Sequence, residues 1–229
     1  MIMTAILSNL QAVHAAIHQA ALEARRDTVQ ITLLAVSKTV PASVIREAYS
    51  RGQTAFGENY VQEALDKMHE LRDLPLEWHF IGPIQSNKTR AIAENFSWVH
   101  SVDRLKIAER LSEQRPANLP PLNVCLQINV SGEASKGGIA PDDAAAIAKS
   151  IAILPRLRLR GLMAIPAPAD EISVQRAPFA RMREILIKLN ATGLNLDTLS
   201  MGMSHDLSAA ILEGATIVRV GTAIFGSRA

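Results

Sequence analysis

The chain has 229 residues, of which 48% are hydrophobic and 4% aromatic, and a formal net charge of +2. This near-neutral charge, spread along the chain, excludes the basic footprint of a nucleic-acid-binding protein, and no apolar stretch is long enough to span a membrane. Cys125 is the single cysteine, so neither a disulfide framework nor a zinc site is expected. We therefore predict a soluble, cytoplasmic protein with one domain over residues 1–229 and no need for a metal.

Short β-type segments alternate with longer helical patterns along the chain. Residues 1–24 mix polar and apolar side chains, which predicts an amphipathic helix rather than a secretory leader. Strands are then expected at residues 31–37, 54–57, 77–81, 98–102, 123–130, 157–164, 198–200 and 216–220. Helices are expected at residues 42–51, 60–71, 87–95, 103–114, 141–154, 174–191 and 206–213, with Asp103 and Asp206 as capping residues.

This alternation predicts the architecture. Strands separated by helices pair in parallel through right-handed crossovers. Eight such units in a chain of 229 residues favour a closed (β/α)8 barrel of the TIM type, with the extra N-terminal helix as a lid on its base. An open doubly wound sheet is the alternative. In a barrel, functional residues lie at the carboxyl ends of the strands, so a site is expected at that rim.

Lys38 is the most informative single residue. It ends the apolar segment 33–37, so its amine is expected at the mouth of the scaffold and partly removed from water. Desolvation disfavours the ammonium form, which makes such an amine a nucleophile suited to a Schiff base with an aldehyde. The plainer interpretation, a strand-end lysine paired with a carboxylate, is left open by this segment alone.

Polar residues and glycines follow the other predicted strands at the same rim. In barrels, the loops after strands seven and eight frequently bind phosphate through backbone N–H groups and hydroxyls. Met203-Ser204 and Gly221-Thr222 occupy these loops and have suitable residue types, so they predict a phosphate site. His205 lies beside them, and we interpret it as a surface residue. The chain has no P-loop or dinucleotide-binding motif.

Seven segments carry a family resemblance. They are AVSK at 35–38, FGENYVQE at 56–63, WHFIG at 78–82, QSNK at 85–88, GLM at 161–163, SMGMS at 200–204 and VRVGTAIFG at 218–226. Through them the chain resembles the pyridoxal 5′-phosphate (PLP) homeostasis proteins, whose single barrel is similar to the amino-terminal domain of alanine racemases. Residues 1–30 and 114–121 match loosely, and Pro83-Ile84 departs from the leucine-containing form of that loop.

The resemblance implies a covalently bound cofactor. It implies that Lys38 bears PLP as an aldimine, that Asn59 lies behind the cofactor and that Arg219 faces the pyridine nitrogen. Ser204 and Gly221-Thr222 would surround the phosphate. The full set of implied cofactor-binding residues is Lys38, Asn59, Met163, Ser200, Met203, Ser204, Arg219, Gly221 and Thr222.

An arginine at the pyridine nitrogen limits the chemistry. Its guanidinium is permanently cationic and only donates, so it would keep the ring nitrogen unprotonated and weaken carbanion stabilisation, which argues against transamination. Racemisation also needs a second acid or base on the opposite face, which in alanine racemases is a tyrosine from a carboxyl-terminal domain and a partner subunit. Because the chain ends at Ala229, no such domain is expected, and the family pattern does not give this role to Tyr49 or Tyr60.

Together, the residues and the resemblance predict a monomeric, non-enzymatic protein. It would hold PLP reversibly on Lys38 and help control the free level of PLP, with PLP-dependent apoenzymes as potential recipients. A PLP-dependent amino-acid racemase or slow lyase is the alternative, and a barrel aldolase that forms a Schiff base with a sugar phosphate is a third. We interpret Lys88, Arg90 and Lys136 as solubilising residues rather than a second cofactor site.

Overall fold

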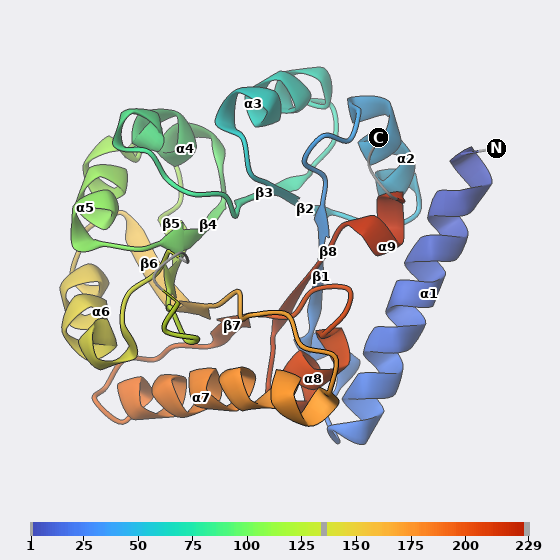
Figure 1. The fold of residues 1–229 in the computed structure, drawn as a ribbon. Coiled ribbons are helices and arrows are strands. Elements are labelled where there is room, and N and C mark those ends of the chain that lie inside the picture. The colour runs from blue at the N-terminus through green and yellow to red at the C-terminus, as the bar shows by residue number, and fades with distance from the viewer. Residues whose placement is uncertain (1, 134–136, 227–229) are drawn as a thin grey trace.

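The computed structural model describes residues 2–133 and 137–226, and its strands form one closed parallel barrel in chain order (Figure 1). Strand β8 pairs with β1, with Leu34 opposite Arg219 and Ala35 opposite Val220. This pairing confirms the TIM-type barrel and excludes the open doubly wound sheet. The strands are β1 (Thr32–Val36), β2 (Ala55–Glu58), β3 (Glu77–Phe80), β4 (Trp98–Val102), β5 (Leu122–Gln127), β6 (Leu157–Met163), β7 (Thr198–Ser200) and β8 (Ile217–Val220).

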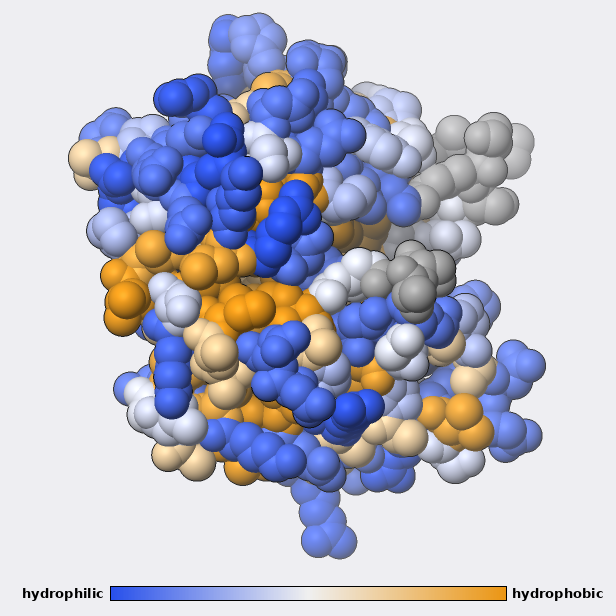
Figure 2. All heavy atoms as spheres, turned by 60° about the vertical axis from the view of Figure 1, so that its left-hand side comes forward, coloured by the Kyte–Doolittle hydropathy of each residue, from blue (hydrophilic) through white to orange (hydrophobic). Residues whose placement is uncertain are grey.

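Helices surround the strands and cover the outside of the barrel (Figure 1). They are α1 (Ile2–Glu23), α2 (Ala42–Ser50), α3 (Val61–Glu70), α4 (Thr89–Asn95), α5 (Leu105–Gln114), α6 (Ala144–Ala152), α7 (Ile172–Asn190), α8 (Leu207–Leu212) and α9 (Thr222–Phe225). Figure 2 shows that the face it draws is largely hydrophilic, with hydrophobic residues gathered in a central band. Within residues 2–133 and 137–226, no helix combines the length and the apolar character that crossing a membrane requires.

The predicted elements are all present, but several boundaries and caps differ. Strand β5 ends at Gln127 rather than at residue 130, because the chain there forms an isolated bridge between Ile128 and Ile139. The prediction that Asp103 caps α5 is wrong, since Arg104 is the N-cap residue and makes no side-chain cap bond. Asp206 is the N-cap residue of α8, yet its side chain makes no bond to that helix.

Helix α1 lies along the flank of the barrel, so the prediction of a lid on the base is wrong. It packs mainly against α8 and α9, which have only six and four residues and cover little of the barrel wall. In the first half of α1, Asn9 Nδ2 donates to Ile224 O at 2.9 Å. Just beyond its carboxyl end, Arg26 Nη1 donates to Ala215 O at 2.8 Å. Helix α1 therefore fills the gap that the two short helices leave, and α9 itself was not predicted.

The barrel has an inner and an outer core. The outer core lies between strands and helices, and the inner cluster consists of Leu34, Ala55, Trp98, Cys125, Met163 and Ile217. Because side chains alternate along a strand, residues two positions from these also face the interior. Buried His100 and Arg219 therefore face the interior, and His100 contacts the buried side chains of His79 and Ser200 there. The barrel interior is therefore apolar in part and polar in part, and its polar residues must be hydrogen-bonded.

Candidate functional site

Lys38 lies at the carboxyl rim, two residues beyond the end of β1. Ser37 N donates to Gly57 O at 2.9 Å, which extends the pairing with β2 as far as the residue before Lys38. Leu34 belongs to the inner cluster. Because side chains alternate along a strand, the half-buried side chain of Lys38, four residues later, lies on the same inner side of the barrel. Thr39 then has a φ of 62°, an unusual conformation for a β-branched residue. The chain thus turns sharply immediately after the lysine that the sequence singled out.

A buried ion cluster supports this turn. Lys67 Nζ donates to Ser37 O at 2.7 Å, to Glu58 Oε1 at 2.8 Å and to Glu63 Oε1 at 2.5 Å. Ser37 Oγ also donates to Glu58 Oε1 at 2.7 Å, and Thr39 N donates to Glu63 Oε1 at 2.5 Å. We call Ser37, Thr39, Glu58, Glu63 and Lys67 the Lys67 cluster.

The Lys67 cluster holds the backbone on both sides of Lys38, through Ser37 O and Thr39 N. Desolvation raises the pKa of Glu58, and the hydrogen bonds from Lys67 and Ser37 oppose that rise. The sequence reasoning missed this cluster. Its one visible signal was the spacing of Glu63 and Lys67, which places them four residues apart on α3.

Arg219 is buried inside the barrel and held by oxygens of β7 and of the residue after β6. Its Nη1 donates to Ser200 O at 2.5 Å and to Ser200 Oγ at 2.8 Å, and its Nη2 donates to Ala164 O at 2.8 Å. Three of the five N–H donors of this arginine thus have acceptors within the described residues. Burial lowers the pKa of Arg219 to about 10, so the guanidinium remains cationic at neutral pH.

A column of polar side chains continues from Arg219 toward the amino-terminal end of the barrel. Ser200 Oγ lies 2.7 Å from His100 Nδ1, and His100 Nε2 lies 2.9 Å from His79 Nδ1. His79 Nε2 lies 2.6 Å from Oε1 of Glu77, whose side chain is 50% exposed. We call Glu77, His79, His100 and Ser200 the polar column. The sequence analysis did not identify it, although a histidine inside each of two apolar strands was a possible signal.

The loops after β7 and β8 meet beside α1, as the phosphate prediction requires. Ser204 of the first loop and Ala223 after the second line the same cavity of about 200 Å³, together with Val13 and neighbouring small residues of α1. Ser204 and Thr222 are exposed at the rim. The structure therefore brings the two predicted loops together, with both hydroxyl-bearing residues open to solvent.

Gly202 and Asp206 shape the first of these loops. Gly202 has a φ of 93°, and a Cβ there would lie 2.5 Å from that of Ala210, so only glycine fits. Asp206 Oδ1 accepts a hydrogen bond from Met203 N at 2.5 Å. Exposed Met203 and His205 line a second hollow of about 460 Å³ on the same rim, beside Asp206.

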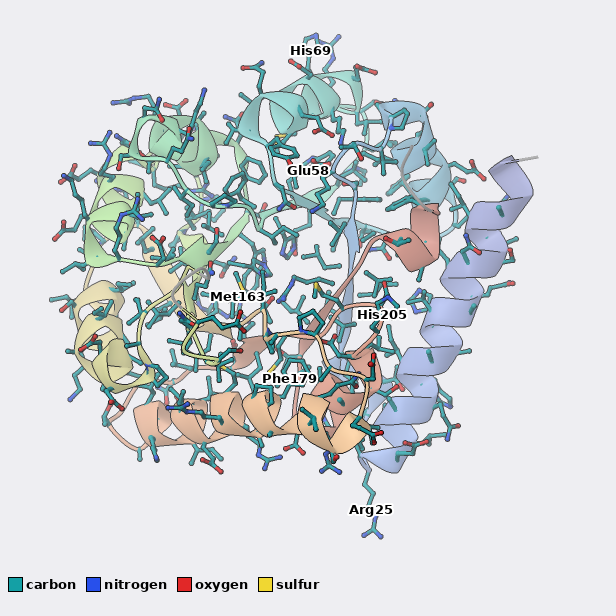
Figure 3. All side chains as sticks on the ribbon, in the orientation of Figure 1. Arg25, Glu58, His69, Met163, Phe179 and His205 are labelled. Carbon is teal, nitrogen blue, oxygen red and sulfur yellow. The ribbon has the colours of Figure 1, made fainter. Side chains whose placement is uncertain are left out.

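The remaining predicted site residues lie in two different places. Asn59 follows β2, and its Oδ1 is buried without a hydrogen-bond partner among the described residues. A Cβ on Gly82 would lie 2.2 Å from Asn59 O, so the loops after β2 and β3 approach closely only because residue 82 is glycine. Met163 is fully buried, and Figure 3 shows it inside the barrel, whereas His205 lies near α8. Lys136 lies outside the described residues.

Comparison with known proteins identifies the family. The family model for the alanine racemase N-terminal domain matches residues 8–229. A pyridoxal phosphate homeostasis protein of Pseudomonas aeruginosa is 66% identical over 226 residues, which cover 99% of this chain and 97% of that protein. The chain therefore belongs to the alanine racemase N-terminal domain family and, within it, to the pyridoxal phosphate homeostasis proteins. This confirms the resemblance carried by the sequence motifs.

Solved structures agree with this assignment. The structure of PipY from Synechococcus elongatus PCC7942 with PLP bound has a TM-score of 0.82 and 40% identity, covering 96% of this chain and 100% of that one. Alanine racemase from Corynebacterium glutamicum has a TM-score of 0.74 at 20% identity, with 99% of this chain and 62% of that one covered. At that identity the racemase shares the fold, and its activity does not transfer.

Proposed function

We propose that this protein binds PLP at the carboxyl rim of the barrel, with Lys38 as its Schiff-base lysine, and controls the free level of PLP without efficient catalysis. The observation that carries the proposal is the adjacency of β1 and β8, which places buried Arg219 in the barrel interior beside the strand that ends at Lys38. An amine and a guanidinium there suit the aldehyde and the ring nitrogen of PLP. The PLP-bound structure of PipY and the name of the Pseudomonas relative support this proposal.

The residues present fit this cofactor. Arg219 retains N–H donors that no described residue accepts, and a pyridine nitrogen is a suitable acceptor. At the same rim, Asn59 Oδ1 is buried and has no partner among the residues that the structure describes, which is costly unless a ligand or water satisfies it. Ser204, Gly221 and Thr222 supply hydroxyl and backbone N–H donors in the two loops that suit a phosphate. When bound, PLP would supply an aldehyde that reacts with amines.

The surroundings of Lys38 and Arg219 favour binding of PLP over catalysis with it. The Lys67 cluster holds the backbone around Lys38 in one conformation. Cationic Arg219 can only donate to the ring nitrogen, so it keeps that nitrogen unprotonated and weakens the ring as an electron acceptor. Met163 and Ser200 are fully buried, whereas Met203 is exposed on the rim. The alternative is a racemase or slow lyase. Steady turnover of an amino acid would distinguish such an enzyme from a PLP-binding protein.

The test begins with the absorbance spectrum of the purified protein, after incubation with PLP and after borohydride. We expect a visible band that borohydride converts to a permanent adduct on the peptide containing Lys38. Lys38→Ala should lose the band and the adduct, whereas the matched control Lys188→Ala, on α7, should keep both. A protein that stays colourless with PLP would refute the proposal, and a trapped sugar phosphate would then favour an aldolase.

Two further measurements address catalysis and partners. Steady racemisation or β-elimination of L-amino acids that Lys38→Ala abolishes would refute the non-catalytic part of the proposal. All proposed cofactor contacts come from one chain, so we propose a monomer, which sedimentation equilibrium can check. The proposed recipients are PLP-dependent apoenzymes, and activation of an added apoenzyme by the PLP-loaded protein tests transfer directly.

A further inference from the structure

The polar column lies between two groups whose hydrogen-bonding roles are fixed by their chemistry, Arg219 and Glu77. Arg219 has only donors, so Ser200 Oγ must accept from it. At the opposite end, the hydrogen bond with His79 holds the pKa of Glu77 below its ordinary value, so Glu77 is a carboxylate that only accepts. His79 Nε2 must therefore carry a hydrogen, which it donates to Glu77 Oε1.

The hydrogens between these two ends follow from the count of donors and acceptors. Desolvation lowers the pKa of His79 and holds the pKa of His100 well below its ordinary value, so each ring is neutral with one hydrogen. With its hydrogen on Nε2, His79 accepts at Nδ1, and His100 must donate to it from Nε2. His100 then accepts at Nδ1, and the hydroxyl of Ser200 donates to it. No other arrangement of neutral rings satisfies every contact.

We propose that Glu77, His79, His100 and Ser200 form one directed hydrogen-bond chain, with both histidines protonated at Nε2, that orients Arg219 toward a heteroaromatic nitrogen acceptor at the rim. These four are positioning residues, since they act through Arg219. The ligand named here rests on the proposed function, whereas the direction of the chain rests on the contacts together with the ionised state of Glu77 and the neutral state of both rings.

The packing around the column keeps its middle in place. The ring of Trp98 stacks on His79 with centroids 5.4 Å apart and an interplanar angle of 5°. The guanidinium of Arg160 lies 4.7 Å from the centroid of Trp98 and pairs with Asp197 at 2.8 Å. This cation also helps to hold the pKa of Glu77 below its ordinary value. Half-exposed Glu77 is thus the end of the chain that can be altered without disturbing buried packing.

The first experiment measures histidine tautomers in the protein without PLP. Long-range ¹H–¹⁵N NMR of the side chains distinguishes the Nε2–H, Nδ1–H and cationic forms, and His→Gln variants of the four other histidines assign the signals. We expect the Nε2–H form for both His79 and His100 at neutral pH. An Nδ1–H or cationic signal from either ring would overturn the proposal, whatever the protein binds.

The second experiment breaks the chain at its exposed end. Glu77→Ala removes the terminal acceptor, so we expect a mixture of tautomers at His79 and a changed spectrum of bound PLP. The dissociation constant of PLP should rise about two- to tenfold, the weight of one net hydrogen bond. The control Glu94→Ala removes a glutamate of similar exposure on α4, away from the column and its packing, and should leave tautomers, spectrum and affinity unchanged.

The outcomes separate this proposal from the proposed function. If the tautomers are as expected but the wild-type protein binds no PLP, the proposed function fails and the directed chain stands. If PLP binds and Glu77→Ala leaves its spectrum and affinity at the wild-type values, the orienting role is wrong. Equal effects of Glu77→Ala and Glu94→Ala would also overturn that role, because they would indicate a general loss of charge.

Discussion

Removing the charge of Lys67 should destabilise the protein strongly. Lys67 and Glu58 form an ion pair whose side chains are only 8% and 0% exposed. The substitution Lys67→Met keeps much of the side-chain length but leaves the carboxylate of Glu58 buried, with the hydroxyl of Ser37 as its remaining donor in the described part of the chain. Glu58 Oε2 already has no partner among the described residues. The variant therefore contains a nearly uncompensated buried charge.

The burial of the Lys67–Glu58 ion pair determines how much stability the variant should lose. Exposed ion pairs contribute about 0–1 kcal/mol, whereas removing one partner of a buried pair costs about 3–5 kcal/mol. For a chain of this length we expect Tm to fall by roughly 6–20 °C in Lys67→Met. The control Lys149→Met replaces an exposed lysine on α6, and its effect should stay within about 0.5 kcal/mol.

The loss of stability in Lys67→Met should depend on pH. Burial raises the pKa of Glu58, so the folded state holds this proton more tightly than the unfolded chain. The free energy of unfolding then falls as the pH rises from about 4.3 through the folded pKa. Removing Lys67 raises that pKa further, so Lys67→Met should lose more stability over a wider pH range and differ least from wild type near pH 4.

Urea unfolding at several pH values between 4 and 8 is the assay. The double variant Lys67→Met/Glu58→Gln removes both charges and should recover most of the lost stability at neutral pH. The reasoning would be refuted by a loss below about 1 kcal/mol in Lys67→Met at neutral pH, or by a double variant no more stable than the single one.

Three further predictions concern other parts of the structure. Ser204→Ala should weaken PLP binding by about 1–3 kcal/mol and leave the binding of pyridoxal, which lacks the phosphate, unchanged in calorimetry; equal losses would remove Ser204 from a phosphate site. Gly161→Ala should lower the free energy of unfolding in urea by about 3 kcal/mol or more, because its Cβ would lie 1.8 Å from Thr198 O. In the control Gly193→Ala the Cβ meets no atom within 4 Å, so the loss should be only about 1–2 kcal/mol from backbone strain at a φ of 93°. Cys125 should resist iodoacetamide at pH 8 until urea unfolds the protein, since burial raises the pKa of its thiol to about 12, and rapid labelling of the native protein would contradict this.

The order and type of the main elements could be predicted because each depends on local pattern. Apolar segments of strand length alternate with helical periodicity through the chain, and a short crossover helix between strands leads to parallel pairing. Helix α9 was missed since its four residues carry too little periodicity. The predicted location of α1 was wrong. The location depends on how much of the barrel wall α8 and α9 leave uncovered, and this is decided by tertiary packing.

By itself, the sequence determined the barrel class, Lys38 at the end of its first strand, and the two loops that meet at the rim. These depend on residue type and on position relative to a strand end. Only the tertiary structure decided what surrounds Lys38 and Arg219. The Lys67 cluster and the polar column join residues from different strands, such as His100 and Ser200, which are 100 positions apart in the chain. No local pattern encodes such a contact, because it exists only once the barrel closes and buried polar groups must find partners across its interior.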